Sequence, residues 1–396
     1  MYIVFATLAM LSFLGSALVL GYLAKTDRSA PRFSDSLKVI GTTNVSDVLL
    51  SVIIPARDEG EVISKCIESL LVQTHSNQEI IVVDDSSTDN TRDVVSSLAK
   101  KDSRVRLVSA GSKPEGWVGK SWPCWKGYEH SSGSYLLFID ADSALGQSTV
   151  ELSLRYGVEK KLDMLSLSPK VEMVGLAARA VLPLISGAIN LLYPMHKVND
   201  KKSKRAYVFG TFVLVRRSTY EAIRGHETVK EELVEDAAIA RVTKEAGFAL
   251  RIERGSEFLS TLWESDSRSI YHGLERITSS SVRSYGLVSI LNAILLFFMT
   301  LYPIVYVISY VLSRPIGDAA LLGLVAALLN IVVFFSLSEL ETATISGSLG
   351  PYAILYPVGS IFFMSAIIST SIKVVASKEL KWKGSGYVQA PDSKAR

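Results

Sequence analysis

The hydrophobic residues of this chain follow two different patterns, and the first consists of long runs. Four runs are apolar and almost free of charge: residues 2–24, 285–312, 318–337 and 352–376. A helix of about 20 apolar residues can cross the hydrocarbon core of a bilayer. We therefore expect an N-terminal transmembrane anchor over residues 1–24 and C-terminal transmembrane helices within 285–376.

Basic residues beside these runs indicate their orientation, because cytoplasmic flanks are enriched in Lys and Arg. They follow the first run and precede the second: Lys25, Arg28, Arg32, Arg268, Arg276 and Arg283. We therefore expect a multi-pass protein of the cell membrane whose middle region is cytoplasmic. Three C-terminal crossings would leave the C-terminus outside, but a basic group favours the inside: Lys373, Lys378, Lys381 and Lys383. The number of C-terminal spans and the side of the C-terminus stay open.

The second pattern fills the middle of the chain, where short apolar runs alternate with amphipathic segments. Runs typical of buried strands occupy residues 49–56, 79–85, 104–110 and 135–142, with later strands expected at 162–168, 207–217 and 249–253. Helical spacing of apolar residues occurs at 61–73, 91–100 and 234–246. This alternation predicts an α/β fold with a doubly wound, mostly parallel sheet over residues 49–284. Residues 25–48 are interpreted as a linker and 377–396 as a basic tail.

One apolar stretch, residues 174–194, lies inside this middle region. Its length is typical of a buried core helix, and a helix lying in the membrane interface is the alternative. A true span is disfavoured, because it would place the two halves of one domain on opposite sides of the bilayer.

Composition narrows the possible functions. The chain has 396 residues, is 48% hydrophobic and carries a net charge of +3, so we expect no broad nucleic-acid-binding surface. The two cysteines, Cys66 and Cys124, cannot form a disulfide scaffold and do not have metal-ligand spacing.

Acidic residues follow two of the predicted strands: Asp84, Asp85, Asp140 and Asp142. In open α/β sheets, ligands bind outside the carboxyl ends of the strands. Asp140 and Asp142 could converge on Mg²⁺ or Mn²⁺, which prefer carboxylate oxygens and bridge to substrate phosphates. A D-x-D pattern alone is a weak signal, but its position after an apolar strand makes it a strong one.

Two acidic pairs each have two interpretations. Asp84 or Asp85 could accept hydrogen bonds from a nucleoside, or the run from Asp84 onward could cap the next helix. Glu235 and Asp236 begin a predicted helix, where the helix dipole favours acids, so capping is the simpler interpretation. The alternative for Asp236 is a general base that deprotonates an acceptor hydroxyl.

Four segments in this order resemble the successive motifs of family 2 glycosyltransferases: SVIIPARDEGEVISKCIESLLVQT, EIIVVDDSSTDNT, YLLFIDAD and ELVEDAAIARVTKEAG. The resemblance covers about residues 49–255 and implies the GT-A fold and an inverting sugar transfer from a nucleotide-diphosphosugar. It implies nucleotide-sugar binding by the first two motifs and the D-x-D segment: Pro55, Ala56, Glu59, Asp84, Asp85 and Asp140. It also implies that Asp140 and Asp142 hold the metal ion and that Asp236 is the catalytic base.

A further segment, GWVGKSWPC at residues 116–124, resembles a W-x-G-K-x-W element of carotenoid- and hopanoid-associated members, as Trp382–Lys383–Gly384 resembles their W-K-G element. By this resemblance Lys120 would bind the diphosphate. Trp117 and Trp122, together with Glu235, would border the donor or acceptor. Packing within the loop is the alternative for Lys120 and for both tryptophans.

The Q-x-x-R-W motif of processive synthases is reduced here to Arg276, which disfavours polymer synthesis. The sequence thus predicts transfer of a sugar to a lipid with a hydroxyl or carboxyl group, such as a carotenoid or other terpenoid. A polyprenyl-phosphate sugar synthase is the alternative, although its anionic acceptor needs no general base. A catalytically silent GT-A membrane scaffold is a further alternative. His226, ahead of the acidic pair, receives little weight.

Overall fold

The computed structural model describes residues 2–263, 267–375, 379–382 and 385–388. The chain forms two compact units. The α/β unit comprises Ala30–Glu172 and Tyr193–Leu262, and the helical unit comprises Met1–Ser29, Met173–Leu192 and Trp263–Arg396.

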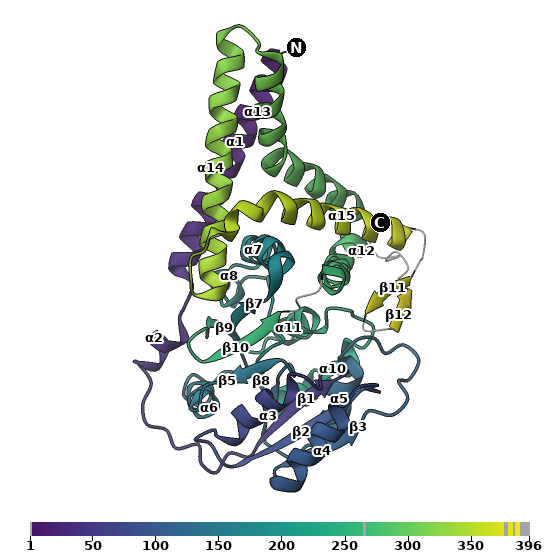
Figure 1. Ribbon diagram of the computed structural model, residues 1–396. Helices are drawn as coiled ribbons and strands as arrows, with labels where there is room; N and C mark the ends of the chain where they lie inside the picture. The colour runs from purple at the N-terminus through teal and green to yellow at the C-terminus, as the bar shows by residue number, and fades with distance from the viewer. Residues whose placement is uncertain (1, 264–266, 376–378, 383–384, 389–396) are drawn as a thin grey trace. The chain divides into compact units, whose positions relative to one another are not determined.

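A mixed sheet forms the centre of the α/β unit (Figure 1). Its strands, in the order in which they lie side by side, are β3 (Val105–Ser109), β2 (Gln78–Asp84), β1 (Leu50–Ala56), β4 (Tyr135–Phe138), β8 (Val213–Arg216), β6 (Met164–Ser168) and β9 (Leu250–Arg254). Neighbouring strands run parallel except that β8 is antiparallel to both β4 and β6. The expected mostly parallel, doubly wound sheet is therefore confirmed.

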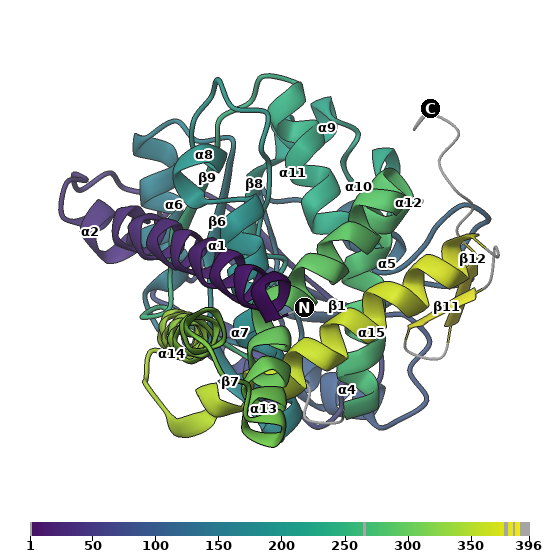
Figure 2. The same ribbon diagram turned by 90° about the horizontal axis from the view of Figure 1, so that it is seen from above.

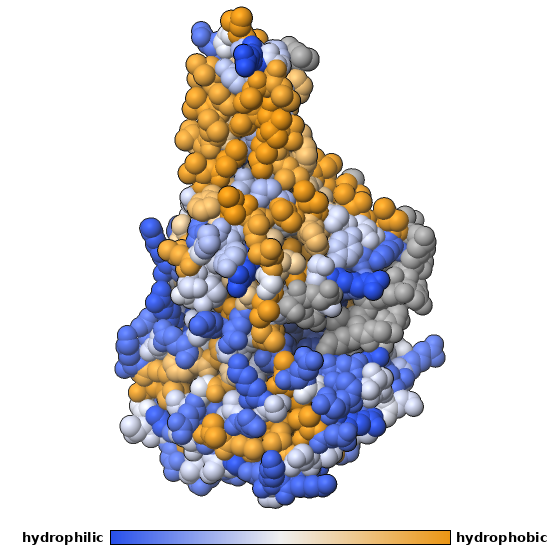
Figure 3. Space-filling view, in the orientation of Figure 1, coloured by the Kyte–Doolittle hydropathy of each residue, from blue (hydrophilic) through white to orange (hydrophobic). Residues whose placement is uncertain are grey.

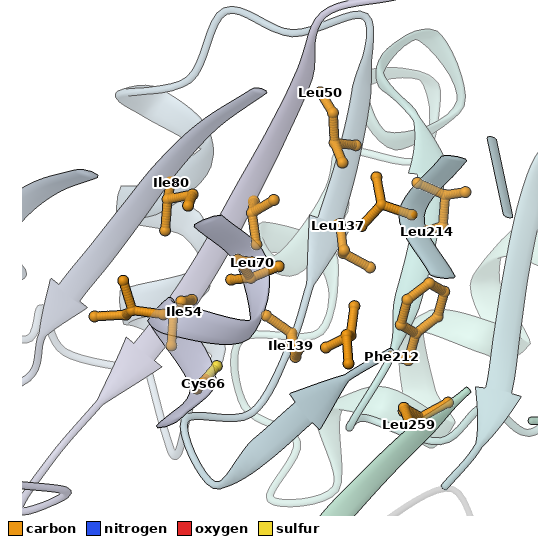
Figure 4. Packing of buried hydrophobic residues seen from close by; sticks show 14 of the residues in the cluster. Leu50, Ile54, Cys66, Leu70, Ile80, Leu137, Ile139, Phe212, Leu214 and Leu259 are labelled. Carbon is orange, nitrogen blue, oxygen red and sulfur yellow. The ribbon is translucent and has the colours of Figure 1, made fainter. Parts of the chain in front are cut away.

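Helices cover the sheet, and their apolar faces form the core. The longer ones are α3 (Ile63–Leu71), α4 (Thr91–Lys101), α5 (Ser121–Glu129), α6 (Thr149–Glu159) and α11 (Glu235–Glu245). The shorter ones are α2 (Phe33–Leu37), α8 (Met195–Val198), α9 (Arg217–Ala222) and α10 (Gly225–Thr228). Cys66 and Leu70 lie four residues apart on α3, and both face buried side chains of the sheet, including Ile54 and Leu137 (Figure 4).

The chain turns sharply after β4, at the segment expected to be the end of a long strand. It passes through Asp140 and Asp142 into β5 (Ser143–Leu145), which joins a small sheet with β10 (Leu259–Trp263) and β7 (Lys170–Met173). The backbone N–H of Leu262 donates to the carbonyl oxygen of Asp142 at 3.3 Å. The second sheet therefore fixes the backbone of the D-x-D segment.

The segment expected to be a linker is more ordered than its composition suggested. The first helix, α1 (Tyr2–Ser29), continues beyond residue 24, and α2 follows closely. Phe33 is fully buried and makes edge contacts with Tyr156 and Phe258, at centroid distances of 5.6 and 5.0 Å. Part of the expected linker therefore belongs to the core of the α/β unit, because burying a large aromatic ring lowers the free energy of the folded state.

The helical unit consists of long apolar helices. They are α1, α7 (Gly175–Leu192), α12 (Ser267–Thr300), α13 (Tyr302–Ser313), α14 (Asp318–Ser346) and α15 (Tyr356–Val375), with a short 3-10 turn, η1 (Pro351–Leu355). Helices α1, α13 and α14 lie side by side, and α14 is seen nearly end-on in Figure 2. Their outer surface is largely hydrophobic (Figure 3), with Leu18 and Leu312 76% and 79% exposed.

Several of these helices are long and apolar enough to cross a membrane. Within the described ranges they are Tyr2–Ser29, Gly175–Val198, Asp318–Ser346 and Pro351–Val374. The bent pair Val288–Thr300 and Tyr302–Ser313 adds a fifth if it forms one span. The long apolar helices expected at both ends of the chain are therefore present in the fold.

The two units do not divide where we expected. Residues 173–192, and the part of α12 before residue 285, were assigned to the α/β domain but belong to the helical unit. In the basic tail, β11 (Glu379–Trp382) pairs with β12 (Ser385–Val388). Lys383 and Gly384 of the W-K-G element lie outside the described residues, as does Lys378.

Candidate active site

A pocket of about 430 Å³, open to solvent, lies at the carboxyl ends of β1 and β4. Residues predicted from sequence line it: Pro55, Lys120, Asp140, Glu235 and Asp236. The rest of its described lining is Cys124, Phe138, Ile139, Met164, Gly210, Val213, Val215, His226 and Ile239. Segments 180 residues apart in sequence thus meet at the strand ends, as expected for an open α/β sheet.

Lys120 and Asp140 form an ion pair at this pocket. Lys120 immediately precedes α5, and its Nζ donates to Asp140 Oδ1 at 2.6 Å. The loop that carries the lysine is fixed by the backbone N–H of Val118, which donates to the Lys230 carbonyl at 2.8 Å. A short, charge-assisted contact of this kind places a cationic group beside the D-x-D segment.

Asp142 is half-buried two residues further along the same turn, and it is not part of the pocket lining that the structure describes. Its Oδ1 accepts a hydrogen bond from the Thr261 hydroxyl at 3.0 Å. Burial and the neighbouring Asp140 carboxylate raise the pKa of Asp142 to about 7, since both disfavour a second negative charge there. A bound cation would therefore stabilise both carboxylates, in addition to the Lys120 ammonium that already pairs with Asp140.

The acids after β2 are buried and paired with basic residues. Arg92 Nε donates to Asp84 Oδ2 at 2.6 Å, and Lys113 Nζ donates to Asp85 Oδ2 at 3.1 Å. Lys113 also donates to the Gly119 carbonyl at 3.0 Å, which connects the end of β2 to the loop that carries Lys120. Neither acid belongs to the pocket lining described above.

The loop after β1 is cross-linked to the loop after β2. Ala56 pairs with Asp84 across the two strands, and the N–H of Glu59 donates to Thr91 Oγ1 at 2.8 Å. Asp58 adopts a φ of 53° and accepts from the Thr88 N–H at 2.7 Å. Together these contacts form a cross-linked rim beside the pocket, and the rim contains three of the residues predicted to bind nucleotide, Ala56, Glu59 and Asp84.

Glu235 and Asp236 occupy the first turn of α11. Asp236 Oδ1 accepts from the N–H of Ala237 at 2.7 Å, and an acid in the first turn is favoured by the helix dipole. A Cβ added at Gly210 would lie 2.9 Å from Asp236 Oδ2, so the glycine leaves room for this second oxygen. The carboxylate therefore stabilises its helix and also lines the pocket.

The tryptophans of the 116–124 segment are occupied in packing. Trp117 and Trp122 meet edge to face, with centroids 5.1 Å apart. Trp122 Nε1 donates to the Ala110 carbonyl at 2.9 Å. Neither ring is among the lining residues described for the pocket, and their contacts match the packing alternative.

Sequence reasoning gave no role to Cys124 and little weight to His226, yet both line the pocket. The signal for His226 was its place shortly before the acidic pair. His226 is held by Tyr220, which lies six residues before it, and packs against Phe138 of β4. No sequence pattern links these residues. Both cysteines are free and buried, and burial raises the pKa of the Cys124 thiol, which therefore stays protonated.

Comparison with known proteins adds independent findings. Residues 51–224 match the family model described as Glycosyl transferase family 2. The 4,4'-diaponeurosporenoate glycosyltransferase of Staphylococcus aureus is 23% identical over 354 residues, covering 87% of this chain and 90% of that protein. Glycosyltransferase GlyG of Streptococcus pneumoniae is 31% identical over 116 residues, and the match spans 29% of this chain and 37% of that protein.

One solved structure has the same fold over nearly the whole chain. It is the mannosyltransferase PcManGT from Pyrobaculum calidifontis in complex with GDP-Man and Mn²⁺. The comparison gives a TM-score of 0.50 and 14% identity, and covers 94% of this chain and 98% of that one. Together with the family match, it confirms the fold class expected from the sequence.

Proposed function

We propose that this chain is a family 2 glycosyltransferase that glycosylates a lipid, since residues 51–224 match the family model and the chain has the GT-A fold. The proposed donor is a nucleotide-diphosphosugar, and the proposed acceptor is a hydroxyl or carboxyl group of a carotenoid or other terpenoid. Transfer inverts the anomeric centre in a single displacement.

One observation carries this proposal. Lys120, Asp140 and Asp236 line the same pocket, although they come from three separate segments of the chain. A cationic group suits a diphosphate leaving group, and a carboxylate suits a proton acceptor. A sugar held between these groups would have its leaving group on one side and its acceptor on the other.

The residues then take separate parts in the reaction. Asp236 accepts the proton of an acceptor hydroxyl as that oxygen attacks the anomeric carbon, and the bond from this carbon to the diphosphate oxygen breaks. Lys120 contacts the diphosphate and stabilises its growing negative charge. The rim built by Ala56, Glu59, Asp84 and Asp85 binds the nucleoside.

The carboxyl pair fits a divalent cation. Asp142 lies beside Asp140, and desolvation and the Asp140 carboxylate raise its pKa despite the Lys120 cation, so a further cation would stabilise the pair. The two carboxylates would hold Mg²⁺ or Mn²⁺, with further ligands from the diphosphate, since no group of three or more acidic, His or Cys residues suited to a metal occurs in the described ranges. Such an ion supplies Lewis-acid stabilisation of the leaving group.

The lipid acceptor is supported by two findings. Apolar helices long enough to cross a membrane belong to the same chain. A relative aligned over most of both chains is named for a carotenoid acid, 4,4'-diaponeurosporenoate.

The basic residues Lys25, Arg28 and Arg32 support a cytoplasmic position for the α/β unit.

The proposal is tested with membranes that contain the full chain. They are incubated with UDP-glucose, UDP-galactose, UDP-N-acetylglucosamine and GDP-mannose, each with a terpenoid carboxylic acid, a terpenoid alcohol or a polyprenyl phosphate. Mass spectrometry should detect a glycosylated terpenoid in wild type. With the terpenoid alcohol, whose hydroxyl needs a base, Asp236→Asn should form this product about 10³-fold more slowly. EDTA should abolish the product, and Mg²⁺ or Mn²⁺ should restore it.

Other results would contradict parts of this assignment. Product formed only with polyprenyl phosphate would show that the acceptor is a lipid phosphate rather than a terpenoid. Asp236→Asn would then keep its activity, because that acceptor needs no base. Absence of nucleotide-sugar binding by calorimetry would indicate a scaffold without catalysis.

A further inference from the structure

A buried pair of side chains, Tyr220 and His226, adjoins the pocket through His226. Tyr220 is fully buried and His226 is 4% exposed, and His226 is part of the pocket lining. The Tyr220 oxygen lies 2.8 Å from His226 Nδ1 and also accepts from the His226 backbone N–H at 3.2 Å. The histidine is therefore held to the tyrosine by both its ring and its backbone.

The backbone before His226 is built for this contact. Arg224 and Gly225 both adopt left-handed conformations, with φ of 57° and 43°. A Cβ added at Gly225 would lie 2.1 Å from Tyr220 Cζ, so a side chain at this position would collide with the ring. The glycine thus permits the close approach that brings His226 to the tyrosine hydroxyl.

The pair selects one tautomer of the histidine. The hydroxyl oxygen already accepts the backbone N–H, and its own hydrogen needs an acceptor because the group is buried. Within the described ranges, His226 Nδ1 is that acceptor. A neutral imidazole that accepts at Nδ1 carries its proton on Nε2, so Nε2–H is a donor.

Burial keeps both partners in these protonation states. It lowers the pKa of His226 to about 3 and raises the pKa of Tyr220 well above its usual value. Phe138 packs edge-on against the imidazole at a centroid distance of 4.8 Å and limits its rotation. The ring is therefore a fixed, neutral donor rather than a proton shuttle.

We propose that His226 determines sugar specificity by donating its Nε2–H to one hydroxyl oxygen of the transferred sugar. This inference rests on the proposed function. In the proposed reaction the diphosphate lies beside Lys120 and the metal site of Asp140, and the acceptor lies beside Asp236. The sugar must therefore lie between these groups, in the pocket that His226 also lines. Much of the described pocket wall is apolar, including Phe138, Met164 and Val213. One neutral donor there would discriminate strongly between sugars with and without a hydroxyl at the matching position.

The consequence is selectivity for a donor with a hydroxyl at one particular carbon. A site that donates to a substrate hydroxyl rejects the analogue without it, because the buried donor is then left without a partner. A charged donor would instead bind most strongly to the phosphates, whereas a neutral imidazole has no such preference.

The test uses the full chain with the donor that wild type uses best among the four named above, and its monodeoxy analogues. His226→Leu should lower kcat/KM for the parent donor about 30-fold, the range expected for one lost hydrogen bond. One monodeoxy analogue should lower wild-type kcat/KM to a similar degree. In His226→Leu, kcat/KM should be about the same for that analogue as for the parent donor.

Two controls separate this role from a structural one. Inhibition by the nucleoside diphosphate alone should stay within about twofold of wild type in His226→Leu, since the nucleotide rim is untouched. His226→Gln, which keeps a side-chain N–H, should recover part of the selectivity. Equal losses for every monodeoxy analogue, or loss of nucleoside diphosphate inhibition, would contradict the inference. A wild-type protein that transfers no sugar from any donor would instead contradict the proposed function.

Discussion

The two units use their polar side chains differently. In the α/β unit, Lys120, Asp140 and Asp236 line a pocket. In the helical unit, buried polar side chains join neighbouring helices. Glu341 on α14 accepts from Ser186 and Asn190 on α7: the distances are 2.6 and 2.9 Å.

Two more clusters in the helical unit show the same use. Glu275 on α12 accepts from Ser369 and Lys373 on α15, at 2.6 and 2.5 Å. Asn330 on α14 donates to Ser12 on α1 at 2.6 Å. Between apolar helices no water is available to satisfy such groups, so the helices satisfy each other. Loss of a polar group should therefore reduce activity in one unit and stability in the other.

The largest effect is expected for the proposed base. Asp236→Asn should lower kcat about 10³-fold, because the amide cannot accept the acceptor proton. The amide oxygen can still accept from the Ala237 N–H, so thermal unfolding should change little. Transfer assays and thermal unfolding in detergent check both halves. An active Asp236→Asn enzyme would remove the base from the mechanism.

The strand-end acids were predictable because their positions follow from topology. Apolar strands and helix-spaced residues predict a parallel sheet, and such a sheet brings residues at its carboxyl edge together. Asp140 could thus be expected at the ligand-binding edge of the sheet. Asp236, in the first turn of α11, was expected at the same site only from the family resemblance, and the structure places both on one pocket. Their chemical roles stay predictions.

Features that depend on close contacts between distant segments were not predictable. Helix α5 contains Pro123 and Gly127, which obscure its helical pattern, yet a Cβ at Gly127 would lie 2.3 Å from Ile53 Cγ2. The glycine there reflects tight packing on β1. The contact of Gly225 with Tyr220 is of the same kind, and it decides where His226 lies.

The next effect concerns stability rather than chemistry. Lys373→Met should leave the buried Glu275 without its cationic partner and lower the free energy of unfolding by about 3 kcal/mol. Activity at a temperature where the protein remains folded should stay close to wild type. Replacing both residues, as in Glu275→Leu with Lys373→Met, should recover part of the loss. Chemical denaturation and transfer assays on the same samples provide the measurement.

A smaller loss of activity is expected at the diphosphate side of the pocket. Lys120→Met removes the cation beside Asp140 and should lower kcat/KM about 10²-fold, the size expected for one donor to a developing anion. Lys126→Met is a matched control, because its Nζ pairs with Glu129 and lies outside the described pocket lining. Equal activity of the two variants would show that Lys120 takes no part in leaving-group stabilisation.

The smallest effect on stability is expected for the hydrogen bond between Ser12 on α1 and Asn330 on α14. It tests whether the polar contacts between these helices stabilise the fold without a part in the reaction. Asn330 also donates to the Met299 carbonyl at 3.3 Å, and Ser12 donates to the Phe298 carbonyl at 2.6 Å. Both carbonyls lie just before the break between α12 and α13, where the helical hydrogen-bond series is interrupted. A double-mutant cycle with Ser12→Ala and Asn330→Leu should give a coupling of about 0.6 kcal/mol, the average for hydrogen bonds between membrane helices. Unchanged transfer activity in all three variants would support the contrast between the units, and a loss of activity would mean that this bundle contributes directly to the chemistry.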